Sequence, residues 1–201
     1  MCQKRCAVGV CGVKLKIPDV KDLKRVCKAI DAGWGSDSND PVGSGKAMRE
    51  KINNHPLDFV KRLRGDIGDR FPSIVLPDGT AVERLPGFSR WIFTCDTNEF
   101  VGQIGFRGRV GCVSLPVHCL GHIGYTIVPA WRGKGHASAA LVLMLREVKK
   151  MDLPYVYVCC DNTNLASARV MEKVGCVMQS LKPYPDVLKR SGFFRTYRYE
   201  F

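Results

Sequence analysis

The chain has 201 residues, of which 45% are hydrophobic and 25% charged, a composition typical of a globular domain with its own core. No apolar run is long enough to cross a bilayer, which excludes a protein with membrane-spanning helices. The formal net charge of +12 favours an anionic ligand, such as nucleic acid, an acidic substrate or a polyphosphate cofactor, without choosing among them.

The first third of the chain predicts one strand followed by helices. The strand is expected over residues 10–17, and the helix after it ends at Gly33. Residues 33–45 are rich in glycine, serine and aspartate and predict a loop. A helix follows from about Lys46, and Pro56 ends it and starts another.

From residue 74 onward the pattern favours strands. IVLPDGTAVERL and RWIFTCDTNEFVGQIGF each predict a hairpin, the first with Pro-Asp-Gly as its turn. The remaining prediction runs in chain order: a loop at 108–120, a strand HIGYTIV, a helix at 134–149, a buried strand YVYVCC, a helix at 166–174 and a closing strand at 192–201. Hairpins followed by alternating strands and helices predict a mixed sheet with helices on both faces.

Ten cysteines are spread along the chain, without a C-x-x-C pair or paired histidines nearby. This spacing is not that of a zinc site, and a chain of this length needs no disulfide scaffold. Cys159 and Cys160 end an apolar strand, where free thiols act as small hydrophobes. We therefore expect no metal site and a cytoplasmic protein. The short apolar stretch at 7–13 has no A-x-A cleavage site after it, so we expect no signal peptide.

The segment WRGKGHA joins the strand HIGYTIV to a helix. The first turn of a helix leaves backbone N–H groups unpaired, and the helix dipole makes that end positive. Gly133 and Gly135 keep side chains away from this turn, and Ala137 is small. Arg132 and Lys134 add positive charge. The segment therefore predicts a pyrophosphate cradle, with a solvated glycine-rich helix start as the alternative.

Two patterns here resemble signatures of the GNAT superfamily of N-acetyltransferases. R-x-x-G-x-A, from Arg132 to Ala137, is similar to the family's acetyl-CoA pattern, [Q/R]-x-x-G-x-[G/A]. DNTNLASARVMEKVGC resembles the second signature, N-x-x-S followed by E-K-x-G-F, with Cys176 in place of the usual Phe. With GHIGY and the closing RTYRYEF, these motifs look like a bacterial-type subgroup of predicted acetyltransferases. The resemblance covers about residues 75–201 and is loose over 1–70.

The resemblance implies a single GNAT domain over residues 1–201. Residues 75–201 would form its core with the acetyl-CoA site, and residues 1–70 an N-terminal strand and helices. The fold would be α/β, of mixed α+β type, with a mixed and mostly antiparallel twisted sheet of about six to seven strands. Acetyl-CoA would be the cosubstrate. Its pantetheine arm would lie in a wedge where the family's fourth strand splays from the fifth.

The same resemblance assigns the cofactor-binding residues. They are two strand residues, the cradle and two positions of the second signature: Ile127, Val128, Arg132, Gly133, Lys134, Gly135, His136, Ala137, Asn164 and Ser167. Ile127 and Val128 would offer backbone groups to the pantetheine arm. Asn164 also suits a helix N-cap, and the two roles are compatible. His136 is expected to face solvent or the phosphates.

The implied reaction is direct attack of a neutral amine on the thioester. No Glu lies in HIGYTIV, so His122 is the candidate base, with a purely structural histidine, or Glu99 and a water chain, as alternatives. The family's usual acid, a Tyr four residues after the Ser, is replaced by Met171, which cannot donate a proton. Tyr125 is the candidate acid, although strand alternation places it opposite His122. Alternatively, the thiolate leaves unassisted.

We thus expect an N-acetyltransferase acting on a primary amine of a small or amino-acid-like molecule. A protein N-terminal or lysine acetyltransferase and a non-catalytic acyl-CoA sensor remain alternatives. The basic residues lack interleaved aromatics and a recognition helix, which argues against a nucleic-acid partner. The acceptor pocket is expected from the N-terminal helices and the loops 108–120 and 184–194. The protein would be a monomer or a homodimer and would not bind membranes.

Overall fold

The computed structural model describes residues 12–37, 39–66 and 73–201. Its main sheet is built from β1 (Val13–Lys16), β4 (Gly87–Thr94), β5 (Phe100–Arg107), β6 (Ile123–Ile127), β7 (Tyr155–Asp161), β8 (Val177–Pro183) and β9 (Phe193–Glu200). These seven strands are ordered β1-β4-β5-β6-β7-β9-β8. All neighbours pair antiparallel except β6 and β7, which are parallel. The mixed, mostly antiparallel sheet of the prediction is confirmed.

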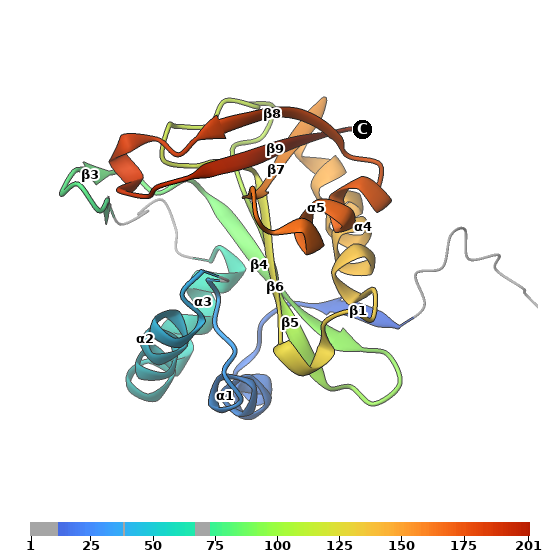
Figure 1. Cartoon of the computed structure of the whole chain (residues 1–201). Helices are drawn as coiled ribbons and strands as arrows, with labels where there is room; N and C mark the ends of the chain where they lie inside the picture. The colour runs from blue at the N-terminus through green and yellow to red at the C-terminus, as the bar shows by residue number, and fades with distance from the viewer. Residues whose placement is uncertain (1–11, 38, 67–72) are drawn as a thin grey trace, which may run out of the picture.

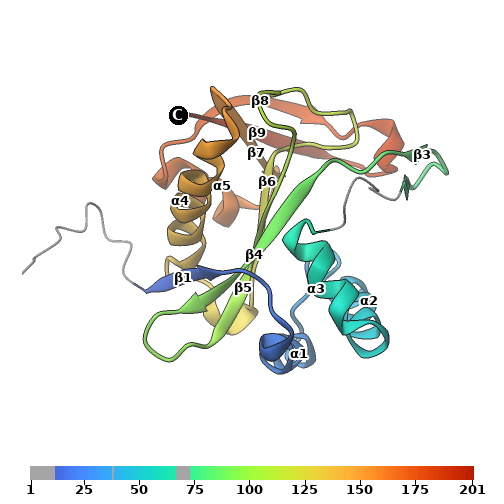
Figure 2. The same cartoon turned by 180° about the vertical axis from the view of Figure 1, so that it is seen from behind.

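The α-helices cover both faces of this sheet, as predicted. They are α1 (Leu23–Asp31), α2 (Pro41–Asn54), α3 (Pro56–Arg64), α4 (His136–Val148) and α5 (Leu165–Lys173). Helices α1, α2 and α3 lie on one side of the sheet, and α4 and α5 on the other (Figures 1 and 2). No helix in the described part of the chain combines the length and the apolarity that crossing a bilayer requires.

Two hydrophobic cores result, one on each face of the sheet. Alternation along β4 separates them: Ile92 belongs to the core under α4 and α5, whereas Trp91 and Phe93 pack against α1, α2 and α3. All three side chains are fully buried. The sheet therefore stabilises the helices on its two faces through separate sets of contacts.

Most predicted elements are present, with three differences. Helix α2 begins at Pro41 instead of Lys46, because the Asp40 side chain accepts a hydrogen bond from the Gly43 N–H at 2.9 Å and proline suits a first helical turn. Strand β8 was not predicted, since nearly all its residues are exposed and no alternation marks it. The first hairpin is shorter than expected, with β2 (Ile74–Val75) and β3 (Ala81–Val82) forming a separate sheet. The first two residues of the strand predicted over 10–17 lie outside the described residues.

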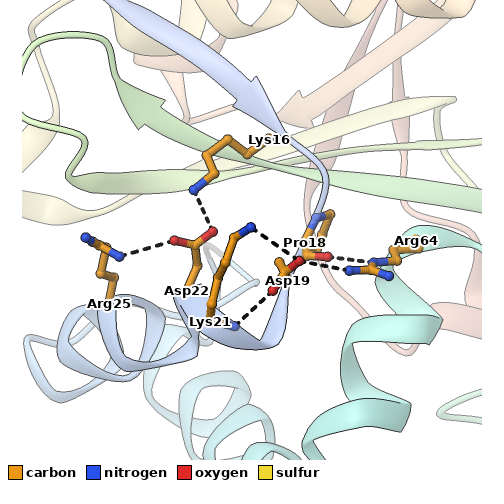
Figure 3. Close-up of polar contacts among 7 residues, drawn as sticks. All are labelled: Lys16, Pro18, Asp19, Lys21, Asp22, Arg25 and Arg64. Carbon is orange, nitrogen blue, oxygen red and sulfur yellow. Dashed lines mark hydrogen bonds and ion pairs between the residues drawn. The ribbon is translucent and has the colours of Figure 1, made fainter.

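An ion-pair cluster fixes the start of α1 to β1. The Asp22 side chain is buried, and its carboxylate accepts hydrogen bonds from Lys16 at 2.6 Å and Arg25 at 3.2 Å (Figure 3). Beside it, Arg64 at the end of α3 donates to the Pro18 carbonyl at 2.7 Å. These contacts join β1, α1 and α3 into one wall of the molecule.

Replacing this buried carboxylate is expected to destabilise the fold. Asp22→Ala should lower the free energy of unfolding by about 2 kcal/mol, because Lys16 loses a charge-assisted hydrogen bond and stays half-buried. Asp31→Ala is the matched control, since Asp31 is exposed and, among the described residues, forms an ion pair with Arg49 alone. Urea unfolding of both variants at pH 7 checks this. Equal effects of the two substitutions would contradict a structural role for Asp22.

Candidate functional site

A cleft of about 1330 Å³ runs through the sheet where β6 and β7 separate. These two parallel strands are in register only at Ile123 and Val158, close to the start of β6. Beyond this point residues of both strands line the cleft, among them Tyr125, Ile127 and Cys160. The strands thus form a wedge at the position that the sequence resemblance implied.

The predicted cradle forms one end of the cleft, at the N-terminus of α4. Gly133 and Gly135 have φ angles of 75° and 81°, in the left-handed region that favours glycine, and a Cβ at either would meet nothing within 4 Å. No side chain caps α4, so the N–H groups of its first turn are open to a ligand. Lys134 is turned toward Trp131, with its Nζ 4.6 Å from the ring centroid. The other cradle residues line the cleft: Arg132, Gly133, Gly135, His136 and Ala137.

Ile127 and Val128, which precede the cradle, differ in the backbone N–H and C=O groups that they leave free for a ligand. The Val128 N–H donates to a β5 carbonyl at 2.9 Å, and its own carbonyl accepts from the Trp131 N–H at 2.9 Å. Val128 therefore has no backbone group for a ligand, and it does not line the cleft. Backbone direction alternates along a strand, so the N–H groups of Ile127 and Tyr125 point toward β7. The Ile127 carbonyl already accepts a hydrogen bond from Arg132 Nε at 3.1 Å, so the Ile127 N–H is the group that remains for a ligand.

The second signature meets β6 across the wedge. Asn164 caps α5, with its Oδ1 accepting the Ser167 N–H at 3.0 Å, so the predicted N-cap is confirmed. The Ser167 hydroxyl oxygen lies 2.8 Å from the Tyr125 hydroxyl, and all three residues line the cleft. Burial raises the pKa of Tyr125, so this hydroxyl stays protonated. Met171, in the position of the family's tyrosine, is fully buried in the core.

The structure does not bring His122 to this site. Its side chain is fully buried outside the cleft lining, and Nδ1 accepts the Tyr157 N–H at 2.9 Å. Burial, aided by the positive charge of Arg107, lowers the pKa of His122 to about 4. A neutral imidazole fixed in this way has a structural role. Glu99 does not line the cleft either; it belongs to the β4–β5 turn, where its N–H donates to Thr94 Oγ1.

This histidine should make the fold sensitive to acid. The unfolded chain binds a proton on His122 near pH 6.5 and the folded chain only near pH 4, so stability falls as the pH falls between these values. The loss should reach about 3 kcal/mol at pH 4. His122→Asn, whose amide oxygen can accept the Tyr157 N–H, should lack this part of the pH dependence. Urea unfolding at pH 7 and pH 4.5 tests it; equal losses in both proteins would contradict it.

Two cysteines, Cys159 and Cys160, lie near the end of β7 beside the wedge, and both line the cleft. The Cys159 thiol donates to the Leu120 carbonyl at 2.7 Å. Burial raises the pKa of Cys159 to about 12 and also raises that of Cys160. Both therefore stay as thiols at neutral pH, which fits the structural role expected of them.

The other half of the cleft lies on the sheet face that carries α1, α2 and α3. Cross-strand partners share a face, and the register pairs Gly87 with Arg107 and Gly105 with both Ser89 and Gly124. The three glycines leave the floor of the sheet bare. Arg107 lies over one of them, because its Nη2 would be 3.1 Å from a Cβ at Gly124.

The walls of this half come from the segments that the sequence predicted. The α1–α2 loop and α3 contribute on one side, and the loops 108–120 and 184–194 on the other: Gly35, Asp37, Asn39, Arg62, His118, Leu120, Tyr184, Leu188 and Arg190. Sequence reasoning missed Gln103, Arg84 and Arg107. No motif assigned any of them a role. The strand register places Gln103 and Arg107 here, and Arg84 lines the cleft from the segment between β3 and β4. This half would hold the molecule that reacts with a ligand in the wedge.

Comparison with known proteins identifies the family. The family model described as "Acetyltransferase (GNAT) domain" matches residues 76–177, just over half of the chain. The chain therefore belongs to the GNAT acetyltransferase family, as the motifs implied, and acetyl-CoA is the acyl donor of that family. An uncharacterized N-acetyltransferase of Bacillus subtilis (strain 168), YnaD, is 26% identical over 138 residues, which are 68% of this chain and 59% of YnaD. The chain thus matches less than two thirds of that relative's length.

Solved structures share the fold. RimL, a ribosomal L7/L12 alpha-N-protein acetyltransferase solved in complex with coenzyme A, superposes with a TM-score of 0.60 at 16% identity over 94% of both chains. MccE, a microcin C7 self-immunity acetyltransferase solved with acetyl-CoA and AMP, gives a TM-score of 0.56 at 12% identity over 98% of both chains. At such identities the likeness concerns the fold alone.

Proposed function

We propose that this chain is an acetyl-CoA-dependent N-acetyltransferase that acetylates the primary amine of a small, amino-acid-like molecule. One observation carries the proposal: a single cleft joins the uncapped N-terminus of α4 to the Tyr125–Ser167 hydroxyl pair. The cradle would bind the pyrophosphate of acetyl-CoA through its backbone N–H groups. The Ile127 N–H would pair with the pantetheine arm. The thioester would then lie near the hydroxyl pair.

The reaction forms one bond and breaks one. The neutral amine attacks the thioester carbonyl, an N–C bond forms, the C–S bond breaks, and the amine nitrogen releases one proton to water, from which Tyr125 regains the proton that it gives to the thiolate. The departing thiolate takes a proton from the Tyr125 hydroxyl, whose bond to Ser167 holds it in the wedge. A backbone N–H of β6 that faces the wedge would stabilise the negative charge on the carbonyl oxygen.

No side chain is assigned as the base. Among the described residues, the carboxylates that line the cleft belong to Asp37 and Asp161, and Asp161 already accepts from Tyr184 at 3.2 Å and Arg190 at 3.3 Å. The cleft instead has an excess of arginine. Positive charge nearby disfavours the ammonium form of a bound amine, and therefore increases the fraction that can attack.

Calorimetric titration with acetyl-CoA tests the cofactor part of the proposal. A panel of amines, including amino acids and peptides with free N-termini, then tests for release of the CoA thiol. Binding together with amine-dependent release is the expected result. Binding without release for any amine would favour an acyl-CoA sensor, release with peptides alone a protein acetyltransferase, and no binding would overturn the proposal. A cytoplasmic location, where buried thiols such as Cys160 stay reduced, is part of the proposal.

A further inference from the structure

Three arginines line the acceptor half of the cleft, which is the half on the sheet face of α1, α2 and α3. Arg62 of α3, Arg84 before β4 and Arg107 at the end of β5 form no ion pair with another described residue. Two neighbouring arginines are paired: Arg90 of β4 lies 2.9 Å from Glu147, and Arg109, in the loop after β5, lies 3.3 Å from Glu83. Three guanidinium groups without an ionic partner among the described residues therefore line the same half of the cleft.

These arginines are close enough to affect one another. Desolvation, and then the positive charges of Arg62 and Arg107, lower the pKa of Arg84. Like charges gathered around one cleft raise the free energy of the unliganded protein, and a bound anion would relieve that repulsion. Arg107 packs over Gly124, the residue before Tyr125, so the cluster reaches the neighbourhood of the reacting atoms.

The cosubstrate does not account for this charge. The phosphates of acetyl-CoA would lie at the α4 cradle, where Arg132 is available, whereas Arg107 projects from the opposite face of the sheet. That face also carries Gln103, whose Oε1 is buried and has no hydrogen-bond partner among the described residues. A free acceptor oxygen suits the N–H of an amine.

We propose that the acetyl acceptor is an amine that carries its own anionic group, a carboxylate or a phosphate. Arg84 and Arg107, with Arg62 beside them, bind the anion, and Gln103 receives the amine. This assignment rests on the proposed acetyltransferase function and names the substrate class of its acceptor half. Guanidinium groups bind carboxylates and phosphates through the same paired hydrogen bonds, so the arginines do not separate the two.

Two matched pairs of acceptors test the assignment: glycine against glycinamide, and O-phosphoethanolamine against ethanolamine. An anionic group raises the pKa of a neighbouring amine, so the neutral member of each pair contains more of the reactive amine at a given pH. We nevertheless expect at least a tenfold higher kcat/KM for the anionic member of one pair. The preferred pair distinguishes a carboxylate from a phosphate. Equal or better turnover of the neutral members in both pairs would overturn the proposal.

Variants of the arginines test whether these residues cause the preference for an anionic acceptor. Arg107→Gln and Arg84→Gln are expected to lower kcat/KM for the anionic acceptor by about 10- to 100-fold, the cost of one charge-assisted hydrogen-bonded contact. The neutral acceptor should lose a clearly smaller factor, because it loses only the effect of the positive charge on the protonation of its amine. Arg109→Gln is the matched control, since it removes the same charge two residues away and outside the cleft. Equal losses for both acceptors, or the same loss in the control, would overturn the assignment.

Calorimetry separates this proposal from the proposed function. If acetyl-CoA does not bind, the proposed function fails, and the anionic amines are then titrated into the free protein. If acetyl-CoA binds without turnover, the same amines are titrated into the CoA-saturated protein. In either case the anionic member of one pair should bind about tenfold tighter than its neutral partner, and Arg107→Gln should abolish the difference. Equal affinities within both pairs would overturn the anionic-acceptor proposal.

Discussion

Gly135→Glu is expected to abolish measurable binding of acetyl-CoA. Gly135 precedes the first turn of α4, with open space where a Cβ would stand, so the new carboxylate would occupy the place of the pyrophosphate. It would repel the phosphates and compete for the N–H groups of the helix start. A loss of about 3 kcal/mol or more corresponds to an affinity at least about 100-fold lower. Calorimetric titration with acetyl-CoA measures it.

Backbone strain is the effect to separate from charge, because Gly135 has a φ of 81°. Gly79→Glu is the matched control. Gly79 has a φ of 90° and open space at its Cβ, and it lies in the β2–β3 turn outside the cleft. It should bind acetyl-CoA like the wild type. Asparagine tolerates a positive φ and adds no charge, so Gly135→Asn should retain most of the affinity for acetyl-CoA. Unchanged binding by Gly135→Glu would place the phosphates elsewhere.

Tyr125→Phe is expected to lower kcat by about 100-fold while the KM for acetyl-CoA changes by less than about threefold. The substitution removes the hydroxyl that lies 2.8 Å from Ser167 Oγ and keeps the ring. A proton donor to the thiolate acts in the transition state and contributes little to ground-state binding. Steady-state release of the CoA thiol, measured with the best acceptor of the amine panel, gives both constants.

The hydroxyl itself must be shown to matter, so Tyr199→Phe serves as the control. Tyr199 packs against the same core from β9 and does not line the cleft, and its variant should keep the wild-type kcat. Ser167→Ala should lower kcat less than Tyr125→Phe does. The Tyr125 hydroxyl also donates to the backbone carbonyl of Ser167, at 3.3 Å, and this carbonyl is kept when the side chain is replaced. If Tyr125→Phe and Ser167→Ala both keep the wild-type kcat, the thiolate leaves without a proton from either hydroxyl.

The parts of the structure that depend on short segments could be predicted from the sequence. The β4–β5 hairpin, the glycine-rich start of α4 and the cap at Asn164 each follow from a few neighbouring residues, and each is present. The Asp40 cap was missed, although Asp-Pro before a helix is itself a start signal. β8 could not be predicted, because an exposed edge strand carries no alternation of apolar residues.

The floor of the acceptor half could not be predicted, because its residues come together only through strand pairing. Gly87, Gly105 and Gly124 share one face only once the register of three strands is fixed. The same pairing places Arg107 over that floor. His122 illustrates the opposite case: its position before β6 suggested a base, but whether it faced the cleft or the interior depended on how β6 packs against β7.

The two separate cores have a consequence for how such an enzyme can diversify. The cradle and the hydroxyl pair rest on the core under α4 and α5, whereas much of the acceptor wall rests on the core formed with α1, α2 and α3. Substitutions that reshape the acceptor wall therefore disturb mainly contacts that the donor half does not share, apart from those of Val128 and Trp131, which also pack against the core of α1, α2 and α3. Substitutions that accumulate in the N-terminal helices could therefore change the acceptor specificity during evolution, while every intermediate protein still bound its acyl donor.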